Sequence, residues 1–111
     1  MARRIAIQPE AEKEITTAVR WYAAHAPGLG REFREELRAC LNRIREHPQA
    51  YQVVRGEARR APLHRFPYSV IYLLDEGTIV VLACFHASRD PGEWERRVPP
   101  RDADTLPQDA E

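Results

Sequence analysis

Hydrophobic and polar residues alternate along residues 3–8 and then recur at helical intervals over two longer stretches. The alternation predicts a short strand with one exposed face, because successive side chains of a strand point to opposite sides. Apolar residues three and four positions apart predict amphipathic helices instead. The two helical stripes are Ala11, Ile15, Ala18, Val19 and Tyr22, and then Phe33, Leu37, Cys40, Leu41 and Ile44. The chain therefore opens with a strand and two helices.

Turn-forming residues mark the ends of these helices. Pro9 stands where a first helical residue would lie, and the three glutamates that follow within five positions favour a helix N-terminus. Residues 27–30, Pro-Gly-Leu-Gly, separate the two stripes, and His47-Pro48 ends the second one. A connection this short makes the helices lie side by side and antiparallel. Their joint apolar surface needs a sheet to cover it.

The second half of the sequence predicts strands. Residues 51–55 form a short predicted strand. Residues 59–65 mix basic and apolar residues around a proline, which indicates an edge strand or a bulge. Residues 66–74 and 79–85 are nearly continuous apolar runs, typical of central strands. The Asp-Glu-Gly-Thr sequence at 75–78 predicts a hairpin turn between them.

These elements predict one α+β domain over residues 1–98. An N-terminal strand precedes a helical hairpin, which packs on one face of an antiparallel sheet of three to four strands. Asp90 is placed to cap a last helical turn, and Trp94 would then fold back onto the sheet. Residues 99–111 hold three prolines, four acids and no aromatic residue, so we expect a flexible acidic tail.

Composition limits the function classes. The formal net charge of the 111 residues is zero, which argues against a whole-protein footprint for nucleic acid. The four histidines and two cysteines form no metal-ligand spacing, so we expect no metal, no cofactor and free thiols. No stretch is apolar over the length that spans a bilayer, and no secretory leader opens the chain. The expected location is the cytoplasm, without membrane association.

The order of elements and two sequence runs resemble the RelE/ParE toxins. The first run is Arg65–Tyr72, followed by the hairpin and the apolar strand at 79–85. The second is His86-Ala87-Ser88-Arg89-Asp90-Pro91 with Trp94 three positions later, a pattern that resembles one, ParE-like, branch of these toxins. The resemblance covers residues 3–98, the whole predicted domain.

This resemblance implies the toxin of a bacterial type II toxin–antitoxin pair. Such a toxin is held inactive by a small cognate antitoxin, with which it forms a hetero-oligomer. Two mechanisms are known under this fold. RelE-like members cut mRNA in the ribosomal A site, and ParE-like members poison DNA gyrase.

The catalytic candidates for RNA cleavage are His86, His64 and Arg60. The reaction needs a base or an oriented 2′-hydroxyl, a cation beside the phosphate and an acid for the leaving oxygen. A ribonuclease site would bring His64 and Arg60 close to His86 in a basic groove. Alternatively, the basic residues of this segment solvate an edge strand, and His86 bonds to neighbouring backbone.

The strand register decides which face of the sheet carries His86. With a regular two-residue hairpin at 75–78, Ser69 faces Cys84, and His86 lies on the same face as both. A slip of one residue would move His86 to the other face.

Five further residues are candidates for contacting the target or the antitoxin, since tryptophan and arginine dominate interface energetics. They are Arg59, Arg65, Arg89, Trp21 and Tyr68. Structural roles remain open for these residues as well: Arg89 can pair with Glu93, and Tyr68 can pack in the core.

We favour gyrase inhibition over RNA cleavage. RNA-cutting relatives often end the last strand with a histidine–tyrosine pair or a tyrosine, whereas here Ala87 and Ser88 follow His86. The lysine-rich patch of those relatives is also missing from this sequence. A ribosome-dependent mRNA endonuclease is the alternative, and an antitoxin-binding domain without toxicity is a second alternative.

Overall fold

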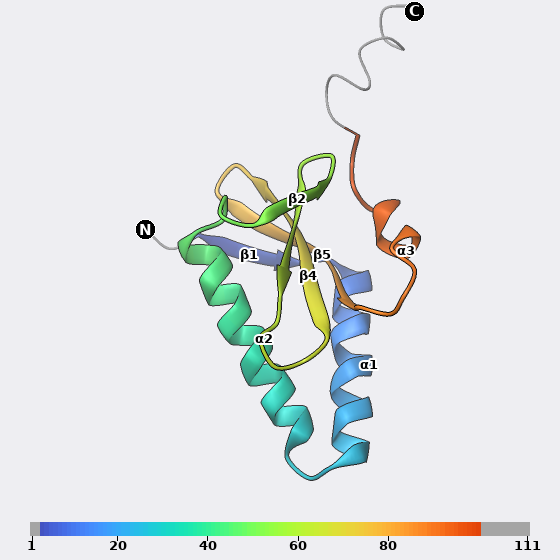
Figure 1. Cartoon of the computed structure of the whole chain (residues 1–111). Coiled ribbons are helices and arrows are strands. Elements are labelled where there is room, and N and C mark those ends of the chain that lie inside the picture. The colour runs from blue at the N-terminus through green and yellow to red at the C-terminus, as the bar shows by residue number, and fades with distance from the viewer. Residues whose placement is uncertain (1–2, 101–111) are drawn as a thin grey trace, which may run out of the picture.

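A computed structural model describes residues 3–100, so all but the first two residues of the predicted tail, 99–111, lie outside the described part. The elements are strand β1 (Arg4–Ile7), helices α1 (Pro9–His25) and α2 (Leu29–Glu46), strands β2 (Gln52–Arg55), β3 (Ala58–Pro62), β4 (Tyr68–Asp75) and β5 (Thr78–His86), and the short helix α3 (Gly92–Glu95). The predicted α+β order is confirmed. Figure 1 shows α1 and α2 side by side beneath the sheet, with their connection projecting beyond it.

The sheet has five strands in the order β1-β5-β4-β3-β2. The four strands that follow the helical hairpin, β2 to β5, are antiparallel, as predicted. Strand β1 joins the sheet at its edge and runs parallel to β5. The predicted antiparallel strands are confirmed as β2 to β5, and the parallel strand β1 makes the whole sheet a mixed one of five strands. The alternating pattern of residues 3–8 specifies a half-exposed strand but neither its neighbour nor its direction. Ile5 and Ile7 pack on the core, which fixes β1 beside β5.

A bulge in β5 changes the register of its second half. Tyr72 pairs with Val81, whereas Ile71 pairs with Ala83, so Leu82 is an extra residue on β5. The predicted two-residue turn is present, because Asp75 pairs with Thr78. The predicted pairing of Ser69 with Cys84 is wrong, because the bulge shifts the partner of Ser69 to Phe85.

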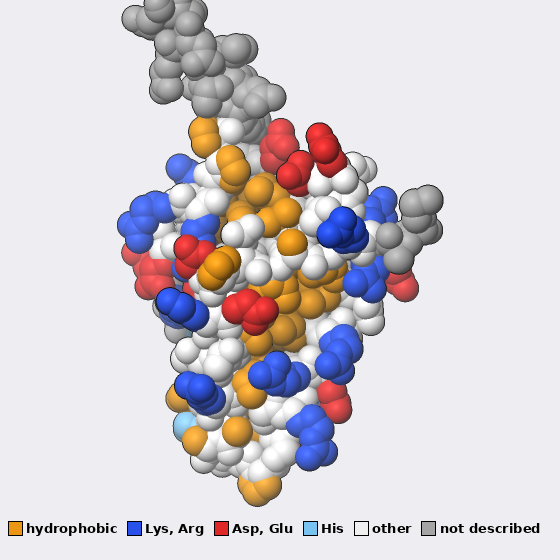
Figure 2. Space-filling view, turned by 180° about the vertical axis from the view of Figure 1, so that it is seen from behind, with side chains coloured by type: hydrophobic (Ala, Val, Ile, Leu, Met, Phe, Trp, Pro, Cys, Tyr) orange, Lys and Arg blue, Asp and Glu red, His pale blue; other side chains and the backbone are white. Residues whose placement is uncertain are grey.

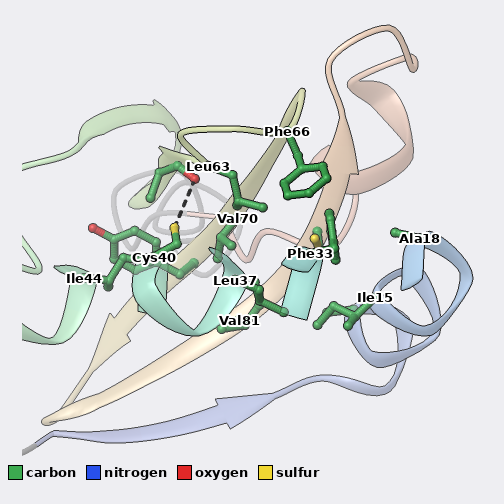
Figure 3. Close-up of a cluster of buried hydrophobic side chains, with 14 of the residues drawn as sticks. Ile15, Ala18, Phe33, Leu37, Cys40, Ile44, Leu63, Phe66, Val70 and Val81 are labelled. Carbon is green, nitrogen blue, oxygen red and sulfur yellow. Dashed lines mark hydrogen bonds between the residues drawn. The ribbon is translucent and has the colours of Figure 1, made fainter. Parts of the chain in front are cut away.

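The main core lies between the hairpin and the sheet. Phe33, Cys40 and Ile44 of α2 are fully buried against Val70 and Val81 of the sheet (Figure 3). Gly30 lets the two helices approach closely, since a Cβ there would lie 2.9 Å from the carbonyl oxygen of Val19. The two helices thus cover the central part of one face of the sheet.

A smaller cluster lies on the opposite face. Ile71, Leu82 and Phe85 pack there with Trp94 of α3, which is 4% exposed. The Asp90 carboxylate accepts the N–H of Gly92, which starts the helical turn. The predicted return of Trp94 to the sheet is confirmed. No helix among residues 3–100 is long and apolar enough to cross a bilayer.

Two side chains complete the open edge of β5. Beyond Val81 the pairing with β1 has ended. The Glu14 carboxylate accepts the N–H of Cys84 at 3.0 Å, and the Arg97 guanidinium donates to the carbonyl of Leu82 at 2.9 Å. Arg97 also donates to both carboxylate oxygens of Glu14, at 3.1 and 3.0 Å. These bonds tie α1, β5 and the segment after α3 together.

Glu14→Ala should lower the free energy of unfolding by about 2–4 kcal/mol, because it leaves a backbone N–H and a half-buried guanidinium without their acceptor. Urea unfolding followed by circular dichroism measures the change. Glu12→Ala, which removes an exposed acid from the same helix, is the matched control and should cost less than about 0.5 kcal/mol. Equal effects of the two substitutions would contradict a structural role for Glu14.

Both cysteines are free and buried in the core. The Cys40 thiol donates to the carbonyl of Ala61 at 3.7 Å (Figure 3). Burial raises the pKa of Cys40 to about 11 and, with the charge of Glu14 adding to it, that of Cys84 to about 12. The thiolate, which is the reactive form, is therefore rare in the folded protein.

Neither cysteine should react with iodoacetamide in the native state at mildly alkaline pH, since both pKa values lie well above that pH. Both should react fully in concentrated guanidinium chloride. Mass spectrometry after timed labelling counts the modified thiols. Fast native labelling of either residue would show that the core opens locally at that position.

Candidate binding site on an aromatic row

Five aromatic side chains form a continuous row of ring contacts from the exposed end of α1 to the end of β5. Ring centroids are 3.7 Å apart for His25–Trp21, 5.0 Å for Trp21–Tyr22, 6.1 Å for Tyr22–Tyr68 and 5.1 Å for Tyr68–His86. We call this set the aromatic row. It joins three of the predicted site residues, Trp21, Tyr68 and His86, in one feature.

Buried rings hold the middle of the row in place. Tyr22 lies on the apolar face of α1, stacked on Phe33 of α2 at 5.4 Å, and its ring meets the edge of Phe66 at 4.8 Å. Tyr68 contacts Phe33 at 5.1 Å. The row is thus fixed by the same contacts that join the hairpin to the sheet.

The hydrogen bonds around His86 define the tautomer of its neutral ring. The backbone N–H of Ser88 donates to His86 Nδ1 at 3.0 Å, and the Ser88 hydroxyl lies 2.9 Å from the same nitrogen. Because Nδ1 accepts, the neutral ring carries its proton on Nε2. His86 then offers a hydrogen-bond donor at Nε2, and its one lone pair is already engaged. This arrangement suits binding better than proton abstraction.

Tyr68 and Arg89 lie close together at this end of the sheet. Burial raises the pKa of Tyr68, and the positive charge of Arg89 opposes that rise. The phenol stays neutral and can both donate and accept. Arg89 forms an exposed ion pair with Glu93, as predicted. An exposed pair of this kind contributes little to stability and leaves the guanidinium free to exchange partners.

Arg65 borders the row on the α2 side. Its guanidinium lies 5.8 Å from the centroid of Phe66 and donates to Glu32 at 2.7 Å. Both charged side chains are largely exposed. Arg65 therefore stands over a ring that supports Tyr22, without contacting the aromatic row itself.

The predicted catalytic set is not assembled. Arg60 pairs with Ile71, whose side chain belongs to the cluster on the face away from the helices, whereas His86 pairs with Tyr68 on the helical face. His64 lies in the loop after β3, where its backbone N–H donates to Glu36 at 2.7 Å. Within residues 3–100, no hydrogen bond, ion pair or ring contact links Arg60, His64 and His86.

Arg59 has a structural role. Its guanidinium donates to the carbonyls of Gln49 and Tyr51, at 3.2 and 2.6 Å, and so holds the connection between α2 and β2. This leaves Arg59 less available for a partner than Arg65 or Arg89.

Two members of the row, Tyr22 and His25, were not among the predicted site residues. Tyr22 was assigned only to the core, and it does pack there. His25 follows Trp21 by four positions, which places both rings on one side of a helix. That spacing is visible in the sequence and could have identified the exposed pair.

The sheet face away from the helices carries a second candidate site. A cavity of about 760 Å³ lies there, with Leu73, Leu74, Val80 and Leu82 among its lining residues. Charged side chains line it as well, namely Glu10, Glu57, Asp75, Arg96 and Arg97. Figure 2 shows apolar side chains gathered in the middle of the molecule and bordered by charged ones, seen from behind. In the part of the chain from residue 3 to residue 100, no three metal-ligating side chains gather into a possible metal site.

Solved structures of the same fold include three bacterial toxin systems. The chain matches E. coli toxin RelE, a double arginine-to-alanine mutant in the free state, with a TM-score of 0.66 and 21% identity over 89% of this chain and 100% of that one. It matches the chromosomal ParDE system of P. aeruginosa (TM-score 0.54, 12% identity, 78% of this chain and 98% of that one). It also matches the toxin–antitoxin complex RelBE2 of Mycobacterium tuberculosis (TM-score 0.55, 15% identity, 78% and 99%). The fold is therefore that of the RelE/ParE toxins.

A family model for the ParE toxin of the type II toxin–antitoxin system parDE matches residues 5–91. The chain belongs to this family, and it is a toxin of a type II toxin–antitoxin system. A search of curated proteins finds no significant relative. The family match ends before Trp94, so the assignment to one branch by the His86–Trp94 pattern stays a prediction.

Nuclear magnetic resonance should find His86 as the Nε2–H tautomer, because the Ser88 N–H occupies Nδ1. Long-range ¹⁵N correlation spectra distinguish the two ring nitrogens. Ser88→Ala should keep this tautomer, since the backbone donor remains, whereas Ser88→Pro removes that donor and should allow mixing of both forms. A dominant Nδ1–H form in the unmodified protein would refute the assignment.

Proposed function

We propose that this toxin inhibits DNA gyrase, using the exposed end of β5 as its main target contact, and that a cognate antitoxin neutralises it. The target contact would comprise Tyr68, His86 and Arg89, with Arg65 at its border. Tyrosine and arginine contribute strongly to protein interfaces, and both kinds are gathered here.

The observation that carries this proposal is the separation of Arg60 from His86 by the sheet. A phosphodiester-cleaving site needs a cation and a proton-transfer group within about 3 Å of the same reacting atoms. Side chains on opposite faces of one sheet, on strands separated by a third strand, cannot meet this condition. A binding mechanism needs no such assembly, so these residues suit it better.

The antitoxin is proposed to dock on the sheet face away from the helices. Leu73, Val80 and Leu82 give an apolar surface there, and charged residues of both signs border it, namely Glu10, Glu57, Asp75, Arg96 and Arg97. An antitoxin segment with apolar anchors and flanking charged residues would fit this combination. Trp21 and Arg59, the other predicted contact residues, lie outside this surface, because Trp21 is on α1 and Arg59 pairs with Tyr72 on the helical face.

A ribosome-dependent endonuclease is the second candidate. The closeness of Tyr68, His86 and Arg89 favours it, since a phenol, an imidazole and a guanidinium could together hold a phosphate. In this alternative His64 and Arg60 take no part in the chemistry, because they lie elsewhere.

Purified toxin should trap gyrase on cleaved plasmid DNA in a supercoiling reaction. Arg89→Ala should weaken this effect about tenfold, as expected for a contributing interface arginine. Arg55→Ala, which removes an exposed arginine from the far edge strand, is the matched control and should leave inhibition unchanged. The quantity measured is the toxin concentration that gives half-maximal linear DNA.

Mapping of mRNA 5′ ends after induction separates the alternatives. New ends within codons, lost in His86→Ala, together with unaffected gyrase would favour the endonuclease. Normal growth on induction, with neither effect, would favour an antitoxin-binding domain without toxicity.

A further inference from the structure

Trp21 is exposed to an extent that the fold does not require. Its side chain is 54% exposed, whereas the second tryptophan, Trp94, is 4% exposed. Among the described residues, the exposed large hydrophobic side chains are Trp21 and Val53. Trp21 lies in the final turns of α1, the end of the helix that leads into the connection to α2 (Figure 1).

The indole of Trp21 is held in one orientation despite this exposure. The His25 ring stacks on it at 3.7 Å with an angle of 25° between the planes. His25 Nδ1 lies 2.7 Å from the carbonyl oxygen of Trp21, a hydrogen bond that fixes the imidazole in turn. The buried Tyr22 ring meets the indole edge-on at 86°. Within residues 3–100, no further ring contacts the indole, and its large exposed area can be reached by a planar ligand.

The surrounding charge is positive. Residues 15–31 carry Arg20 and Arg31 and contain no aspartate or glutamate. The acids at either side of this stretch are both engaged, Glu14 with Arg97 and Glu32 with Arg65. The stretch of chain that carries the exposed ring therefore has a net positive charge, which attracts anions.

We propose that the Trp21–His25 pair stacks on an unpaired nucleobase of a single-stranded nucleic acid, whose phosphates contact Arg20 and Arg31. A flat, rigid aromatic surface beside cations is the combination that single-strand binders use, because every base has a face that stacks. A peptide partner would be favoured by an apolar surrounding, but the charged residues of this stretch, Arg20 and Arg31, are both arginines. The inference does not rest on gyrase inhibition.

Tryptophan fluorescence tests the proposal directly, because the two tryptophans differ in exposure. Titration of the full-length protein with oligo(dT) or oligo(U) should quench the emission of Trp21, while buried Trp94 supplies a constant background. Trp21→Phe should remove the quenching signal but keep most of the affinity, measured with fluorescently labelled oligonucleotide. Trp21→Ala should weaken binding at least about fivefold, the loss expected for one stacked base.

Charge and matched controls complete the experiment. Arg20→Ala should weaken binding and reduce its salt dependence, since one phosphate contact is lost. Val53→Ala removes the other exposed apolar side chain and should leave binding unchanged. Binding of oligo(dT) and oligo(U) alike supports recognition of the base alone, and binding of one supports recognition of base and sugar together.

Three results would overturn the proposal. The first is equal binding of an abasic oligomer, which carries the phosphates without the bases. The second is unchanged affinity in Trp21→Ala. The third is quenching by gyrase or by the antitoxin but by neither oligonucleotide, which would make this surface a protein contact. Because the assay contains no gyrase, its outcome is separate from that of the supercoiling test.

Discussion

The packing of Tyr22 against rings from both the hairpin and the sheet is the contact on which the remaining arrangement depends. Tyr22 stacks on Phe33 of the neighbouring helix and meets Phe66 of the β3–β4 connection and Tyr68 of β4. Aromatic pairs contribute about 0.5–1.5 kcal/mol each beyond the burial of their area. One residue of α1 thus contacts both the neighbouring helix and the sheet. It also carries the exposed Trp21 beside it and positions Tyr68 next to His86.

A second constraint is the open edge of the sheet beside β1. Unpaired strand edges favour association with other chains, and proteins cover them with side chains or short segments. Here α1 supplies Glu14 and the C-terminal segment supplies Arg97, so the backbone of β5 is satisfied beyond the end of β1. The opposite edge, β2, is short and largely exposed.

Much of the fold could be predicted from the sequence, because the pattern of apolar positions reflects burial directly. The stripe containing Phe33, Leu37 and Ile44 and the turn at 75–78 correspond to elements of the structure. The place of β1 could not be predicted, since two apolar residues at alternate positions suit either edge of a sheet. The bulge was also invisible, because Leu82 and Ala83 both fit a buried strand.

The candidate site was predictable only in part, and for a related reason. Trp21, Tyr68, His86 and Arg89 were singled out by residue type and position, and all four lie on or beside the aromatic row. The grouping of His86 with Arg60 and His64 failed because the face on which a strand residue lies depends on register. Glu14 was assigned to the helix N-terminus, where acids are common, and its bond to Cys84 spans 70 positions of sequence.

The extra residue Leu82 has a consequence for how this strand can vary. Val81 and Cys84 both face the helices although three positions separate them, which an unbroken alternation would forbid. Before the bulge the odd-numbered residues of β5, such as Val81, face the helices. After the bulge the even-numbered residues, such as Cys84 and His86, do so. A substitution that removed the bulge would leave the turn between β4 and β5 in place. Tyr68 would then pair with Phe85 instead of His86.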